Sequence, residues 1–233
     1  MRQFHQVDVF SIEALRGNPV AVVHDAEGLS TEQMERFTRW TNLSEATFLL
    51  PPTDPAADYR VRIFTQVGEL PFAGHPTLGT CHAWLAAGGR PRDPERMVQE
   101  CPAGLIPIRR IDGVLAFAAP PTIRSGPVAS EDLARIARVL GIGLDDIIES
   151  QWVDNGPGWV AVMLESAEAV LELRPTGDGE HIDIGVVGLY PEGSECAYEV
   201  RAIFSNERGD ILEDPVTGSL NASLAQWLVG AGL

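Results

Sequence analysis

The sequence predicts an α+β fold in two pseudosymmetric halves, each a barrel-like β-sheet wrapped around a central helix. Three observations support this prediction. Several short motifs recur in the same order at an offset of 139 or 140 residues. Strand-like segments dominate both halves, and each half contains one helix that is apolar around its circumference.

Four pairs of segments carry the repeat. Val20–Val23 recurs as Val160–Met163, Tyr59–Arg62 as Tyr198–Arg201, Phe64–Thr65 as Phe204–Ser205, and His75–Thr80 (HPxxGT) as Asp214–Ser219 (DPxxGS). One such match would arise by chance. Four matches in the same order indicate an internal duplication.

Segments rich in β-branched and aromatic residues, separated by Gly, Pro and Asp, predict the strands. They cover 3–10, 18–24, 46–51, 58–65, 97–101, 105–110 and 113–119 in the first half, and 147–153, 158–164 and 199–204 in the second. A capping box of Ser30 and Gln33 predicts a helix over 31–41, and Ser130 and Gly141 bound another over 131–140.

The two central helices are predicted over 76–87 and 215–229. Each begins with proline at its first position and ends at glycine, and each is apolar on all sides, which indicates burial. The segment Pro120–Ser130 breaks the pattern between the halves. We therefore expect an N-terminal half over 1–120 and a C-terminal half over 121–233.

The composition is that of a globular protein, 45% hydrophobic and 21% charged, with a net charge of −16. This charge argues against nucleic acid and membrane partners. Neither a signal peptide nor a membrane span is recognisable, and Cys81, Cys101 and Cys196 form neither a disulfide framework nor a zinc pattern. We therefore expect a cytoplasmic protein.

A titratable residue stands just before each central helix, His75 in the first half and Asp214 in the second. A buried helix N-terminus attracts a carboxylate, and Gly79 and Gly218 are expected to let the backbone approach a ligand. Glu45 adds a third ionisable group where it interrupts the run into an apolar strand. We therefore expect a small-molecule site between the halves, built around Glu45, His75 and Asp214.

Each of these three residues also has a purely structural interpretation. Asp214 is a good helix N-cap, His75 before proline can be a turn residue, and Glu45 can simply begin a strand. Equivalent repeat positions with different chemistry favour a divided acid–base task. The sequence contains no histidine or carboxylate pattern typical of a metal site and no glycine-rich phosphate loop.

Five segments together resemble the phenazine biosynthesis PhzF-like family, within the diaminopimelate epimerase superfamily. They are Val7–Ser11 with Gly17–Val23, Asn42–Phe48, Phe64–Thr80, Glu213–Ser219 and, as a lesser match, Asp154–Val160. The resemblance spans positions 7–228, and the stretch ELPFAGHPTLG inside the third segment is highly specific.

The resemblance implies a diaminopimelate epimerase-like fold with the active site in a cleft between the halves. It also implies cofactor-independent isomerisation by proton transfer on a small carboxylated metabolite, and a homodimer. The residues it implies are Glu45 as general acid/base, His75 and Asp214 as supporting catalytic residues, and Gly74, Gly218 and Ser219 as the groups that hold the substrate carboxylate. Neither central helix begins with cysteine, which disfavours a two-thiol racemase.

Members of the family continue beyond the second central helix, so the half over 121–233 is expected to be incomplete at its C-terminus. This leaves open a second hypothesis, a non-catalytic metabolite-binding or regulatory protein on the same fold. A hydrolase or lyase that uses Glu45 and His75 is a third, and metal dependence would favour it.

Overall fold

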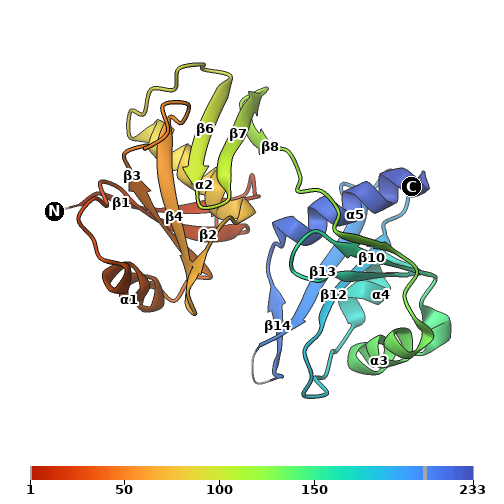
Figure 1. Ribbon diagram of the computed structural model, residues 1–233. Coiled ribbons are helices and arrows are strands. Elements are labelled where there is room, and N and C mark those ends of the chain that lie inside the picture. The colour runs from red at the N-terminus through yellow and green to blue at the C-terminus, as the bar shows by residue number, and fades with distance from the viewer. Residues whose placement is uncertain (1, 207–208, 233) are drawn as a thin grey trace. The chain divides into compact units, whose positions relative to one another are not determined.

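The computed structural model describes residues 2–206 and 209–232, and the chain divides into two compact units, Met1–Ala118 and Ala119–Leu233 (Figure 1). Each unit has its own sheet and its own helices. Both sheets are mixed, and helices cover them, so the predicted α+β class is confirmed.

The first unit is a curled sheet with one helix inside and one outside. Its strands pair in the order β1-β2-β3-β4-β6-β7-β8, with β5 added to β4. The elements are β1 (Phe4–Val9), β2 (Asn18–Val23), α1 (Thr31–Thr41), β3 (Glu45–Leu50), β4 (Tyr59–Thr65), β5 (Glu69–Leu70), α2 (Gly74–Ala86), β6 (Arg96–Cys101), β7 (Gly104–Ile111) and β8 (Val114–Phe117).

The continuous apolar run of β2 explains why both faces of this sheet are covered. Val20 and Val22 join the buried cluster around α2, whereas Ala21 and Val23 join the cluster beneath α1. Successive side chains on a strand point to opposite faces, so an uninterrupted apolar run indicates a strand buried on both sides. The predicted central helix of this half is therefore α2, which contacts strands β1, β2, β3, β6 and β8.

The second unit is a six-stranded sheet in the order β14-β13-β12-β11-β10-β9. Helix α5 covers one face, with Leu220 and Leu224 in its core, and α3 and α4 cover the other, with Ile136 and Val170. The elements are β9 (Arg124–Gly126), α3 (Ser130–Leu140), the 3₁₀ helix η1 (Leu144–Asp146), β10 (Glu149–Asp154), β11 (Val160–Leu164), α4 (Ala167–Glu172), β12 (Asp183–Leu189), β13 (Tyr198–Ser205), β14 (Ile211–Asp214) and α5 (Gly218–Ala231).

The two sheets share one pairing pattern over five strands. β1 pairs antiparallel to β2, β2 parallel to β3, β3 antiparallel to β4, and β4 antiparallel to β5. The strands β10 to β14 pair in the same sense at each step. The repeated sequence segments fall on corresponding strands, β2 with β11 and β4 with β13. This agreement supports the interpretation of an internal duplication, which stays a prediction about the origin of the chain.

The predicted helix 31–41 is confirmed as α1, with the Ser30–Gln33 capping box in both directions. Helix α3 starts at Ser130, so Ser130 is its first residue and Ala129 its N-cap, contrary to the prediction. Gly141 ends α3 in the left-handed conformation (φ 73°), as expected.

The central helices begin at other residues than predicted. Helix α2 starts at Gly74, which makes Pro76 its third residue, a position where proline still loses no intrahelical bond. Helix α5 starts at Gly218, three residues after Pro215, and extends to Ala231. The predicted burial on all sides is wrong for both helices, because Val229 of α5 is 77% exposed and His82 of α2 is also exposed.

Candidate active site

The structure brings together two of the three predicted acid–base residues within the first unit. Glu45 is the first residue of β3, and His75 is the second residue of α2. Glu45 Oε2 lies 3.3 Å from His75 Nε2, and the two side chains are only 16% and 9% exposed. A carboxyl group and an imidazole in such contact can share or relay a proton.

His75 is held in its neutral form. Burial lowers its pKa to about 4, against a smaller opposing contribution from the backbone of Pro19. The pair is therefore not a conventional ion pair at neutral pH, although its nitrogen and oxygen lie close enough for one. A neutral ring can accept or donate a hydrogen bond without placing a positive charge in the buried site.

Packing between α2 and β3 fixes the position of this pair. Thr80 on α2 donates a hydrogen bond to the hydroxyl of Thr47 on β3 at 2.8 Å, and Thr47 in turn donates to the carbonyl of Ala21. Gly79 was expected to face a ligand, and this expectation is wrong. A Cβ at Gly79 would lie 2.4 Å from Val20 Cγ1, so its missing side chain lets α2 approach β2.

The first turn of α2 places backbone amides beside His75. Gly74 and His75 occupy the first two helical positions, whose N–H groups have no partner inside the helix. The N-cap residue Ala73 offers no side-chain cap, whereas Ser30 caps α1. A Cβ at Gly74 would lie 3.0 Å from the ring of Phe117. Of Gly74 and His75, the resemblance assigns Gly74 to the substrate carboxylate.

The second unit holds the other predicted site residues at the start of α5. Asp214 ends β14, and its Oδ2 accepts a hydrogen bond of 2.6 Å from Thr217 Oγ1. Thr217 is the N-cap residue of α5, and Gly218 and Ser219 are its first two helical residues. The structural interpretation of Asp214 as the N-cap is therefore wrong, because its carboxylate bonds the capping residue instead.

Two residues that were not singled out from the sequence hold Ser219 in place. Trp159 donates its indole N–H to Ser219 Oγ at 2.9 Å, and Asn155 Nδ2 donates to the carbonyl of Ser219 at 2.9 Å. Both side chains are buried. They lie in the segment Asp154–Val160, the weakest of the five segments that resemble the family. That match was the sequence feature that could have indicated them.

The site residues thus form two groups, each described within its own unit. Glu45, His75 and Gly74 gather at the start of α2, and Asp214, Gly218 and Ser219 gather at the start of α5. The parallel is close, since each group combines an acidic residue with the first amides of an uncapped central helix.

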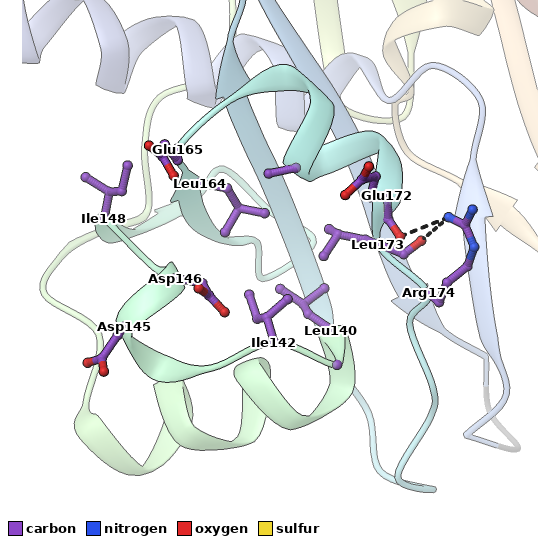
Figure 2. Close-up of a pocket in the computed structure, with 12 residues that line it drawn as sticks. Leu140, Ile142, Asp145, Asp146, Ile148, Leu164, Glu165, Glu172, Leu173 and Arg174 are labelled. Atoms are coloured by element: carbon purple, nitrogen blue, oxygen red, sulfur yellow. Dashed lines mark hydrogen bonds between the residues drawn. The ribbon is translucent and has the colours of Figure 1, made fainter.

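A cavity of about 590 Å³ opens elsewhere in the second unit, between η1, the end of β11 and α4 (Figure 2). Its floor is apolar, with Leu140 and Leu164, and Asp146 points toward its centre (Figure 2). Arg174 donates to the carbonyls of Glu172 and Leu173, which fixes the end of α4. None of the six predicted site residues lines this cavity, and it is not the expected site.

Within residues 2–206 and 209–232, His, Cys, Asp and Glu side chains form no group of three that could hold a metal ion. In the same described ranges, every helix is too short or too polar to cross a bilayer.

Known proteins of one family match this chain over most of its length. The family model described as phenazine biosynthesis-like protein matches residues 7–232. The trans-2,3-dihydro-3-hydroxyanthranilate isomerase of Pseudomonas aeruginosa is 41% identical over 232 residues, which are 97% of this chain and 79% of that protein. The Schizosaccharomyces pombe protein named Antisense-enhancing sequence 1 is 40% identical over 181 residues, 74% of this chain and 60% of that protein.

Solved structures agree in fold. The Bacillus anthracis phenazine biosynthesis protein of the PhzF family matches with a TM-score of 0.82 at 22% identity, over 97% of this chain and 79% of that one. A hydroxyproline epimerase from Agrobacterium vitis matches with a TM-score of 0.50 at 14% identity, over 99% of this chain and 77% of that one. The predicted epimerase-like fold is therefore confirmed.

Three of the similar curated proteins are named trans-2,3-dihydro-3-hydroxyanthranilate isomerase, at 38–41% identity. This agreement confirms the resemblance inferred from the five sequence segments. The match to the family model covers nearly the whole chain. The chain belongs to the phenazine biosynthesis-like (PhzF) protein family, among relatives that are named isomerases.

Proposed function

We propose that this protein is a cofactor-independent isomerase that moves a proton between two carbons of a small carboxylated metabolite, with Glu45 as the general acid/base. The observation that carries the proposal is the contact of 3.3 Å between Glu45 and His75 at the first turn of α2. The name of the Pseudomonas aeruginosa relative supports the same class of reaction.

The reaction balances without a further reactant. The Glu45 carboxylate takes a proton from one carbon of the substrate, and the resulting carboxyl group returns it to another carbon. Neutral His75 faces this carboxyl group and can accept a hydrogen bond from it once it is protonated, which orients the proton for its return. A positioned acid–base group of this kind contributes roughly 10²–10⁴-fold to the rate.

The start of a helix suits the negative charge of such a substrate. Its first amides and its dipole stabilise a carboxylate and the charge that spreads onto it when the proton leaves. Gly74 and His75 offer these amides in α2, and Gly218 and Ser219 offer them in α5. Asp214, just before the start of α5, is proposed as a second polar residue of the reaction.

The hydrogen bonds of Ser219 leave its hydroxyl group available as a donor. Because Ser219 Oγ accepts from Trp159, its own proton is left to donate elsewhere. We propose that it donates to the substrate carboxylate. The prediction that this site uses a carboxylate therefore depends on a hydroxyl whose orientation is fixed by a buried indole.

The experiment is deuterium incorporation followed by NMR in D₂O. The panel contains 2,3-dihydro-3-hydroxyanthranilate, after the name of the relative, with other unsaturated and cyclic amino and hydroxy acids. We expect incorporation at one carbon with the intact protein and none with Glu45→Gln. The matched control is Glu35→Gln, which alters a half-buried carboxylate on α1 near Arg39 and should leave the rate unchanged.

A different result would favour the second hypothesis. If no compound exchanges and several raise the melting temperature equally in the intact protein and Glu45→Gln, the protein binds metabolites without turnover.

We further propose a homodimer located in the cytoplasm. The two buried free cysteines, Cys81 and Cys101, support a reducing compartment. Sedimentation equilibrium of the purified chain tests the dimer, and a monomer at micromolar concentration would contradict it.

A further inference from the structure

The first unit contains a cavity of a size typical of ligand sites, and none of the predicted site residues lines it. It lies between β1 and α1 on the outer face of the sheet and encloses about 520 Å³. Ligand sites commonly enclose about 300–1,000 Å³. The cavity is therefore large enough for a small molecule with one or two rings.

Aromatic rings form the walls of this cavity. The ring centroid of Phe37 lies 5.7 Å from that of Phe4, 6.0 Å from that of Trp40 and 5.9 Å from that of Phe48. Phe48 is fully buried, but Trp40 is 77% exposed and Phe4 is 45% exposed. Exposed aromatic rings that continue a buried aromatic cluster offer a flat ligand both faces and edges for stacking.

The charge of this cavity is opposite to that of the chain. The protein has a net charge of −16, and carboxylates such as Asp146, Glu100 and Asp58 line three other cavities. The cavity beside α1 is lined by two arginines, Arg2 and Arg36, and by no carboxylate. The charged side chains that line the cavity are thus both cationic, which favours an anion there.

The two arginines are suited to carboxylate recognition. Arg2 donates from Nε and Nη2 to the carbonyls of Asp25 and Glu27, which fixes its guanidinium at the edge of the cavity. For Arg36, no hydrogen bond or ion pair is found among residues 2–206 and 209–232. A guanidinium binds a carboxylate through two parallel N–H groups, which a lysine cannot do.

We propose that this cavity binds a small aromatic carboxylate, with the ring between Phe4, Phe37 and Trp40 and the carboxylate on Arg36. The site is separate from Glu45 and His75. The proposal does not depend on the proposed isomerase activity, because it rests on the cavity, its aromatic walls and its charge alone.

Calorimetric titration of the full chain with 1-naphthoate tests this inference, with 1-naphthamide as the neutral analogue of the same shape. We expect saturable binding of one naphthoate per chain and binding of the amide weaker by about tenfold. Arg36→Gln and Trp40→Ala should each weaken naphthoate binding by about tenfold. Arg39→Gln, on the same helix but outside the cavity, should leave it unchanged.

Glu45→Gln separates this site from the proposed active site, because naphthoate should bind this variant as it binds the intact protein. The inference is overturned if naphthoate does not bind, or if Arg36→Gln and Trp40→Ala bind it as tightly as the intact protein. It is also overturned if naphthoate does not bind and Trp40→Ala converts a dimer to a monomer in sedimentation. A second copy of the chain then covers this face.

Discussion

The indole nitrogen of Trp159 donates to the hydroxyl oxygen of Ser219 at 2.9 Å, so a residue between β10 and β11 sets the direction of a hydroxyl at the start of α5. Asn155 holds the carbonyl of the same serine. Together they fix both the backbone and the side chain of Ser219. The carboxylate-binding half of the proposed mechanism depends on this arrangement.

Trp159→Phe should raise the KM for a carboxylate substrate by about three- to tenfold, because the Ser219 hydroxyl then rotates freely, and one hydrogen bond contributes about 0.5–1.5 kcal/mol. The kcat should change less. Trp152→Phe is the matched control, since the buried Trp152 indole nitrogen has no hydrogen-bond partner among the described residues. Equal KM values in the two variants would contradict this role for Trp159.

Asn155→Ala should lower the free energy of unfolding by about 1 kcal/mol, because it removes one of the side-chain donors to the Ser219 carbonyl. Asn155→Asp should cost more, since an ionised carboxylate would face that carbonyl oxygen with no proton to donate. Urea unfolding followed by circular dichroism measures both variants. Equal unfolding free energies for the aspartate and alanine variants would contradict this role for Asn155.

Gly185→Ala should destabilise the second unit by about 1–3 kcal/mol, because the added Cβ would lie 2.3 Å from Leu220 Cδ1. Gly230→Ala is the control within the same unit. It has open space around its Cβ position and lies inside α5, so alanine there should be neutral or stabilising by up to about 1 kcal/mol. The melting temperature should therefore fall for Gly185→Ala and stay unchanged or rise for Gly230→Ala.

The free energy of unfolding should rise with pH between about 4 and 6.5. In the folded protein His75 stays neutral down to its lowered pKa of about 4. In the unfolded chain it takes up a proton below its ordinary pKa of about 6.5. The full contribution is present above pH 6.5 and is lost as the pH falls, by up to about 3 kcal/mol.

His75→Gln removes this titration, so its unfolding free energy should depend less steeply on pH over that window. Denaturant unfolding at pH 4.5, 5.5 and 7 would test the difference. Parallel pH profiles for the two proteins would show that burial of His75 does not depress its pKa.

The acid–base pair could be predicted from the sequence because both residues stand in specific motifs. Glu45 and His75 lie in two of the resembling segments, and the structure places them in contact. The contribution of Trp159 and Asn155 could not be predicted. Their function depends on the loop after β10 reaching the first turn of α5, a contact between residues about 60 positions apart.

The strand β12 was missed for a related reason. Gly185 and Gly188 weaken the strand signal, yet they are required because Leu220 and the backbone of Ser166 pack against them. Local propensity carries no information about such distant neighbours. The start of α2 was misplaced because proline is acceptable at several positions of a first turn, whereas Pro215 lies before the N-cap of α5.

The rate of deuterium incorporation by Glu45→Gln, compared with the intact protein on the substrate that responds, tests the central claim most directly. We expect a loss of at least about 10²-fold with unchanged substrate affinity, because the amide cannot take the proton but fills the same space. Incorporation by Glu45→Gln at the rate of the intact protein would contradict it, and would assign the proton transfer to another residue.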